Sequence, residues 1–195
     1  LLGVDLGGRR IIKKKKRITP EGHLSFAYNA AAEIGELGDN TRVLRAAIRN
    51  DALLARTLLA DTAEVTVLGH TRWASIGIIS QPNAHPMNSD EQGTAPGPYC
   101  TAALNGDVDN FADLKVSDGL RIAAEITSDA KVIPTLVSRR LVAGDQPVEA
   151  FRQTVRRFDG SVAIAANASA APDRIQLALR GSGQALYVGL DDDLF

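Results

Sequence analysis

The chain has 195 residues, of which 45% are hydrophobic and 23% charged, and its formal net charge is -1. This length suits one domain with a sizeable core, and the near-neutral charge argues against a nucleic-acid binder or a protein drawn to anionic membranes. The sequence has no run of about 18 apolar residues, so we expect no membrane-spanning helix. The single cysteine, Cys100, excludes an intrachain disulfide and favours a cytoplasmic location.

The first third is predicted to contain a strand pair and a long helix. Residues 9–28 form the pair, with a turn at 20–22, and residues 39–60 form the helix, because apolar residues recur there at helical spacing. The four lysines at 13–16 have two interpretations. They could bind nucleic acid or polyphosphate, or they could keep an edge strand from pairing with another sheet. We favour the second interpretation, since no second basic patch and no interleaved aromatic residues support the first.

The remaining chain is predicted to mix strands and helices. Strands are expected at 64–72, 99–105, 161–167, 174–180 and 185–190, and helices at 108–115, 129–143 and 147–157. The strand at 64–72 is apolar and should be buried, and Pro134 is compatible with its helix only in the first turn. Two sheets flanked by helices satisfy this order, which predicts an α+β layered sandwich.

Four short polar segments carry the most information about function. They are residues 69–75, 83–86, 104–106 and 127–129. A guanidinium at the end of an apolar strand, here Arg72, suits a carboxylate, which its fork can bind through two hydrogen bonds; a structural salt bridge is the alternative. The Asn105 amide and the Gly106 backbone N–H can stabilise the oxyanion of an acyl transfer, although Asn-Gly alone is an ordinary turn.

The other polar residues of these segments have a structural interpretation beside a functional one. Asp129 can cap a helix, and its carboxylate can also bind an ammonium group, so that Arg72 and Asp129 together read the two charges of an amino acid. Trp73 suits a core as well as a site, whereas the Ser75 hydroxyl can bond a substrate. His85 is either a polar contact in a pocket or a histidine bonded to loop carbonyls.

In their order along the chain, Gly-His-Thr-Arg-Trp, Asn-Ala-His-Pro, Asn-Gly and Ser-Asp resemble the glutaminase domain of class II, N-terminal-nucleophile amidotransferases, most nearly the glucosamine-6-phosphate synthase type. The resemblance covers residues 64–195. It implies a four-layer αββα sandwich of the N-terminal-nucleophile hydrolase type, a single domain over 1–195 that is incomplete at both ends. It also implies hydrolysis of L-glutamine, with the ammonia passed to a downstream synthase or sugar-isomerase domain that converts fructose 6-phosphate into glucosamine 6-phosphate.

The resemblance assigns a role to each matching residue. Asn105 and Gly106 correspond to the oxyanion hole. Arg72 corresponds to the residue that holds the α-carboxylate of glutamine, Asp129 to the one that holds its α-amino group, and Trp73 to a loop that closes over the site. The substrate-binding set implied in this way is Arg72, Trp73, Ser75, His85 and Asp129.

The nucleophile of that family is a cysteine at the mature N-terminus, whose own α-amino group acts as the base. Cys100 lies inside a predicted strand and is expected to pack, not to react. Residues 2–8 resemble a segment that follows the family's cysteine, so we expect the nucleophile upstream of Leu1. The alternative is a catalytically inactive glutamine-binding sensor or scaffold, and a third interpretation is a hydrolase of another amide. The departures from the family pattern that favour the sensor are Ile76, Leu104 and Lys131.

Three histidines and one cysteine at unrelated spacings do not predict a metal site, and we expect no cofactor. The expected partners are glutamine and the downstream domain, with a homo-oligomer, and neither nucleic acid nor a membrane.

Overall fold

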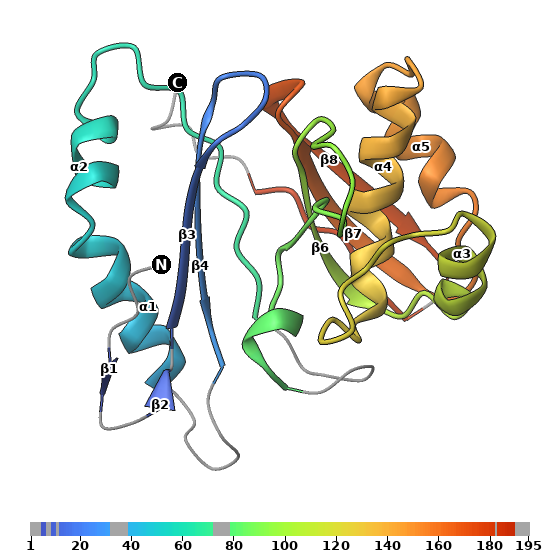
Figure 1. The fold of residues 1–195 in the computed structure, drawn as a ribbon, viewed down its shortest axis with the longest axis horizontal. Helices are drawn as coiled ribbons and strands as arrows, with labels where there is room; N and C mark the ends of the chain where they lie inside the picture. The colour runs from blue at the N-terminus through green and yellow to red at the C-terminus, as the bar shows by residue number, and fades with distance from the viewer. Residues whose placement is uncertain are drawn as a thin grey trace.

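Among the described residues, the two larger of three antiparallel sheets lie between helices in the computed structural model of the chain (Figure 1). Helices α1 and α2 lie outside the β3–β4 pair, and α4 and α5 cover the far face of the larger sheet. The prediction of an α+β fold is thereby confirmed. The structure describes residues 5–6, 9–10, 12–31, 39–71, 79–181 and 183–189.

The predicted strand pair is present as β3 (Ile12–Ile18) and β4 (Leu24–Ala30), joined in antiparallel register. Its turn closes through two hydrogen bonds, from Thr19 N–H to the His23 carbonyl at 2.8 Å and from Gly22 N–H to the Thr19 carbonyl at 2.9 Å. Gly22 has a φ of +88°, a conformation that favours glycine. A second short pair, β1 (Asp5–Leu6) with β2 (Arg9–Arg10), was not predicted.

The alternation of strand β3 divides its basic run between two faces. Lys14 pairs with Tyr28 in the register, and its ammonium lies 5.7 Å from the centre of that ring. Lys16 pairs with Phe26, with its ammonium 5.9 Å from the ring centre. Arg17, on the other face, donates two hydrogen bonds to a carboxylate of the larger sheet's loops, as described below. These residues of the basic run therefore make contacts within the fold.

Polar contacts join the hairpin to the larger sheet. The Arg17 guanidinium donates to both carboxylate oxygens of Asp90, at 2.7 and 3.0 Å, and lies 4.6 Å from the ring centre of Tyr99. At the hairpin turn, the Ser169 hydroxyl bonds the Glu21 carboxylate. A bidentate arginine pair fixes both distance and orientation, so these contacts define how the hairpin sits on the sheet.

The long helix predicted over 39–60 is wrong, because the chain forms two helices, α1 (Asp39–Arg49) and α2 (Ala52–Leu58). The break falls at Asp51, whose carboxylate accepts the N–H groups of Leu53 and Leu54 at 3.1 and 3.2 Å and so begins a new helix. The same carboxylate accepts from Lys16 at 2.6 Å and from the Tyr28 hydroxyl at 2.8 Å. Its attachment to the hairpin explains why the helix ends there.

The larger sheet has the strand order β5-β6-β7-β8, all antiparallel. Its strands are β5 (Met87–Asn88), β6 (Cys100–Gly106), β7 (Val162–Ala168) and β8 (Ala171–Arg180). The even-numbered residues of β6 and β7 enter the main core, which contains Leu104, Ile164, Ile133, Leu136, Phe151 and Phe158. Burial of this apolar set against α4 and α5 is the main hydrophobic contribution to stability.

The helices between β6 and β7 are α3 (Phe111–Ser117), α4 (Val132–Val142) and α5 (Pro147–Val155). The described residues include two 3-10 turns, η1 (Gln81–Asn83) and η2 (Asp129–Lys131), and the second leads directly into α4. Pro134 lies in the first turn of α4, as predicted, where its missing N–H has no intrahelical partner to lose. None of the described helices is long and apolar enough to cross a bilayer.

Two predicted strands are wrong within the described residues. Residues 64–71 form no strand, and Val65 and Val67 are 57% and 75% exposed where burial was expected. Residues 185–189 likewise form no strand. An apolar run becomes a strand only when a neighbouring strand pairs with it, and no neighbour among the described residues pairs with either segment. Residues 72 and 190 lie outside the described residues.

We predict that Asp51→Asn destabilises the protein by about 2 kcal/mol at neutral pH, because an amide keeps the helix cap but loses the charge that binds Lys16. The Lys16 side chain is 40% exposed, so the expected loss of unfolding free energy is smaller than for a fully buried ion pair. The hydrogen bond from Lys16 and that from Tyr28 hold the pKa of Asp51 well below its usual value. The advantage of wild type is therefore complete above about pH 4 and declines as the pH falls further.

Urea denaturation at several pH values measures this difference. Asp61→Asn, which makes the same change at an exposed position, is the control and should match wild type. A difference between wild type and Asp51→Asn that stays constant down to pH 2 would contradict the ion-pair explanation.

Candidate functional site

The structure describes only part of the predicted site. The described residues are His85, Asn105, Gly106 and Asp129. The others, Arg72, Trp73 and Ser75, fall within residues 72–78 and lie outside the described residues. The geometry therefore concerns the last residues of β6, the segment 83–86 and the turn η2.

The Asn105-Gly106 pair ends strand β6 and is not a hairpin turn. Asn105 pairs with Ala163 and is exposed, and Gly106 pairs with Val162. Gly106 has a φ of +107°, and a Cβ placed on it would lie 1.9 Å from the carbonyl oxygen of Ser161. Only glycine fits this position, which explains the residue type independently of any catalytic role.

The N–H of Gly106 faces the edge of β6 that also carries His85. Successive N–H groups of a strand point to alternate edges, and the Leu104 N–H donates to His85 Nδ1 at 3.4 Å. On the other edge, Asp107 N–H donates to the Ser161 carbonyl at 2.9 Å. By this alternation the Gly106 N–H points to the edge of β6 beside the segment containing Asn-Ala-His-Pro.

Asn83 ties the segment 83–86 to the chain just before η2. Its side chain is fully buried, and its Oδ1 accepts the N–H groups of Thr127 and Ser128 at 2.8 and 2.9 Å. Its Nδ2 donates to Ser80 Oγ at 2.9 Å and to the Glu125 carbonyl at 3.3 Å. These four bonds satisfy the amide completely, so the two segments are held in one fixed arrangement.

His85 is buried and bonds two parts of the site. Its Nε2 lies 3.1 Å from Ser128 Oγ, and its ring centre lies 4.8 Å from that of His70. Because Nδ1 accepts the Leu104 N–H, the ring proton is assigned to Nε2, which donates to the serine hydroxyl. In this tautomer Nε2 cannot accept the proton of Ser128, so the two residues do not form a nucleophile and its base.

Asp129 links η2 to the chain that leaves β6. It is 3% exposed, and its Oδ2 accepts the Val108 N–H at 2.8 Å, two residues beyond Gly106. Burial raises the pKa of Asp129 above its ordinary value, against the opposing effect of backbone hydrogen bonds. Neither η2 nor α4 has a side-chain cap, so the bond of Asp129 to Val108 is a tertiary contact and the expected capping of α4 by Asp129 is wrong. A nearby cation would lessen the penalty of burying this carboxylate.

Two residues of this cluster were missed as site candidates by the sequence analysis, Asn83 and Lys131. The signal for Asn83 was its place in Asn-Ala-His-Pro, next to a residue already singled out. Lys131 follows Ser-Asp directly, but lysine is ordinarily a surface residue, and nothing in the sequence indicates that this one is 1% exposed.

Cys100 is a packed core residue, as predicted. It is 2% exposed, and burial, with a smaller effect of Glu21, raises the pKa of its thiol to about 12. A thiol with this pKa stays protonated at physiological pH and does not act as a nucleophile. Among the described residues, no group of three or more potential ligands could hold a metal ion.

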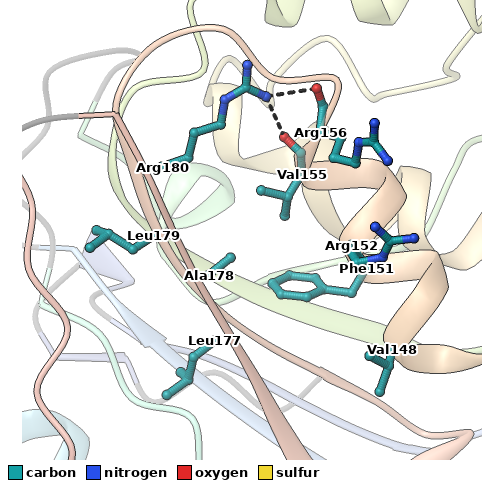
Figure 2. A pocket seen from close by; sticks show the side chains of 9 residues that line it. All are labelled: Val148, Phe151, Arg152, Val155, Arg156, Leu177, Ala178, Leu179 and Arg180. Carbon is teal, nitrogen blue, oxygen red and sulfur yellow. Dashed lines mark hydrogen bonds between the residues drawn. The ribbon is translucent and has the colours of Figure 1, made fainter.

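A groove of about 570 Å³ lies elsewhere, between α5 and β8 (Figure 2). Its lining is mostly apolar, with Phe151 of α5 and Ala178 of β8 pointing toward each other, and it includes three arginines, Arg152, Arg156 and Arg180. The guanidinium of Arg180 donates to the carbonyls of Val155 and Arg156 at 3.1 and 2.8 Å and so closes the end of α5. None of the predicted site residues lines this groove.

Comparison with known proteins places the chain among relatives of one name. It is 32% identical over 185 residues to glutamine–fructose-6-phosphate aminotransferase (isomerizing) of Caulobacter vibrioides, a match that covers 93% of this chain and 28% of that protein. The protein of the same name from Mesorhizobium japonicum is 35% identical over 159 residues, covering 80% of this chain and 24% of the relative. The protein of the same name from Thermococcus kodakarensis is 27% identical over 186 residues, a match that covers 92% of this chain and 28% of the relative.

The chain therefore spans about a quarter of the length of these curated relatives. No family model matches it. The relatives confirm the resemblance on which the sequence analysis drew.

We predict that Gly106→Ala destabilises the protein by about 3 kcal/mol, because the added methyl group collides with backbone and the φ is unfavourable for alanine. Gly119→Ala is the matched control. Gly119 also has a positive φ, +57°, but a Cβ there meets nothing within 4 Å, so this variant should lose only about 1 kcal/mol. Equal losses of unfolding free energy in urea would contradict the close approach of Gly106 to Ser161.

Proposed function

We propose that this chain, a relative of the glutamine–fructose-6-phosphate aminotransferases over most of its length, is the glutaminase domain of a class II glutamine amidotransferase. It hydrolyses L-glutamine to glutamate and ammonia. The name of the relatives points to fructose 6-phosphate as the acceptor, and so to a synthase domain that receives the ammonia and forms glucosamine 6-phosphate.

The layer order supports the finer fold assignment that belongs to this proposal. Helices α1 and α2, the β3–β4 pair, the larger sheet, and helices α4 and α5 follow one another across the molecule (Figure 1). This order corresponds to the αββα sandwich of N-terminal-nucleophile hydrolases.

One observation carries the proposal: segments far apart in the sequence meet at the end of β6 through direct hydrogen bonds. Asn83 bonds Ser128, His85 bonds both Ser128 and Leu104, and Asp129 bonds Val108. These bonds join three of the four segments that the resemblance assigned to one glutamine site; Arg72, in the fourth, lies outside the described residues. The pairing of β5 with β6 brings segment 83–86 close to β6, whereas no strand pairing among the described residues requires η2 to meet either of them.

The proposed chemistry is acyl transfer. A nucleophile attacks the side-chain amide of glutamine, and the resulting oxyanion is stabilised by the Asn105 side-chain N–H and the Gly106 backbone N–H. Arg72 binds the α-carboxylate, and Asp129 the α-amino group. The ammonium group of glutamine offers the buried carboxylate of Asp129 an opposite charge, which favours the binding of a zwitterion over that of a neutral amide.

The proposal is conditional on a cysteine upstream of Leu1. That cysteine attacks the amide, and its free α-amino group accepts the thiol proton and passes it to the departing nitrogen, which leaves as ammonia. Water then hydrolyses the resulting γ-glutamyl thioester, which releases glutamate and restores the thiol. Trp73, Ser75 and His85 complete the proposed binding set.

A second candidate function is a glutamine-binding sensor or scaffold without turnover. The observation that favours it is the departure from the family pattern at Ile76, Leu104 and Lys131. Both candidates require glutamine to bind, so they differ only in the nucleophile and in the use of the oxyanion donors.

We predict that Asn105→Ala lowers kcat for glutamine hydrolysis about 100-fold, with little change in KM, because the lost donor acts only on the transition state. Asn50→Ala, which removes another exposed asparagine side chain at the end of α1, is the control and should keep the wild-type kcat. The measurement is ammonia release by the protein at its natural length. A kcat unchanged by Asn105→Ala would remove that residue from the oxyanion hole.

We also predict that the mature natural protein begins with cysteine. Intact mass and N-terminal sequencing determine this directly. A mature N-terminus of another residue type leaves no nucleophile for the proposed reaction, and the sensor becomes the better account, which glutamine binding measured by calorimetry would then test.

A further inference from the structure

Lys131 is among the largest fully buried side chains of the described residues, with 1% exposure. Its ammonium donates to the Asn88 carbonyl at 2.5 Å, to the Asp90 carbonyl at 2.7 Å and to Asn88 Oδ1 at 3.2 Å. An ammonium in the protein interior is expensive unless every proton has an acceptor, and here three protons meet three oxygens.

These bonds join three parts of the molecule at one atom. Lys131 is the last residue of η2, whose first residue is Asp129. Asn88 ends the short strand β5, three residues after His85. The carboxylate of Asp90 holds Arg17 of the hairpin. The ammonium thus ties the turn that carries Asp129 to the segment that carries His85, and both to the hairpin.

Fold stability alone does not explain a lysine here. A buried charge seldom stabilises a protein more than an apolar side chain of similar volume would. Lys131 also occupies the N-cap position of α4, where the positive end of the helix dipole disfavours a cation. The ammonium instead fixes the placement of η2, because its three hydrogen bonds allow only one arrangement of that turn against residues 88–90.

We propose that Lys131 is a positioning residue for the glutamine site: its ammonium fixes η2 against residues 88–90, and thereby fixes the carboxylate of Asp129 where the α-amino group of glutamine binds. This inference rests on the proposed function. It assigns a role to a residue at which the chain departs from the family pattern, since that pattern has an acidic residue in this place.

Titration of Lys131 offers a direct readout of this role. Burial lowers the pKa of Lys131 to about 8; Asp90 and Glu91 act against this effect, while Lys15 and Arg17 of β3 add to it. Above about pH 8 the wild-type side chain therefore becomes a neutral amine with two protons for three acceptors, and its hold on η2 weakens.

The test compares glutamine hydrolysis by wild type, Lys131→Met and Lys131→Arg at the protein's natural length. At pH 7 we expect Lys131→Met to raise KM on the order of 10- to 100-fold, while kcat changes less than about threefold, because Asp129 contributes to binding. Lys131→Arg retains a positive charge at all pH values used and should give an intermediate KM. The control is Lys115→Met on α3, which should match wild type.

The ratio of variant to wild-type KM is then followed from pH 7 to about pH 9.5. Titration of the amino group of glutamine cancels in this ratio, because it is common to both proteins. For both variants the ratio should fall as wild type loses its ammonium near pH 8. A purely structural contribution of Lys131 would lower the melting temperature without this pH dependence of KM.

Two results would overturn the inference. One is a KM ratio for Lys131→Met below about twofold at pH 7 in a wild-type protein that hydrolyses glutamine. The other is a ratio that stays constant to pH 9.5. If melting curves show that Lys131→Met does not fold, the KM ratio of Lys131→Arg to wild type is used instead, and a ratio that stays constant to pH 9.5 overturns the inference. Wild-type protein that neither binds nor hydrolyses glutamine overturns the proposed function instead, and this is established before any variant is compared.

Discussion

The complete burial of Asn83 is the constraint on which the candidate site depends. An amide without access to water must find its hydrogen-bond partners inside the protein, and Asn83 finds them on two separate segments. Two of these partners are consecutive N–H groups, those of Thr127 and Ser128, so the chain entering η2 has one possible path. Asp129 follows at once, and its bond to Val108 brings the end of β6 into the same arrangement.

Charged side chains extend this order across the layers. Asp51 joins the outer helices to the hairpin, Arg17 and Asp90 join the hairpin to the larger sheet, and Lys131 joins residues 88–90 to η2. Each of these groups has partners on at least two elements. The apolar core beneath α4 and α5 supplies stability, whereas the polar contacts specify how the elements are placed relative to one another.

The sequence analysis succeeded where local information is sufficient. Strand β6, helices α4 and α5 and the hairpin follow from periodicity and turn residues. The motifs also identified segments that do meet. It failed where a distant partner decides: the helix break at Asp51 depends on Lys16 and Tyr28, and residues 64–71 would need a neighbouring strand. Lys131 was unpredictable for the same reason, because its acceptors lie about forty residues earlier in the chain.

The ion pairs of the hairpin differ from the ammonium of Lys131 in their exposure to dissolved salt. The side chains of Arg17 and Asp90 are 37% and 39% exposed, so mobile counter-ions can approach and screen their attraction. Lys131, enclosed by protein oxygens, is insulated from that screening. A rise in ionic strength therefore weakens the Arg17–Asp90 contact that holds the hairpin against the larger sheet. It leaves the hydrogen bonds of Lys131 between η2 and β5 intact. A change in ionic strength would thus alter how firmly the hairpin is held without altering the arrangement of the cluster around Asp129.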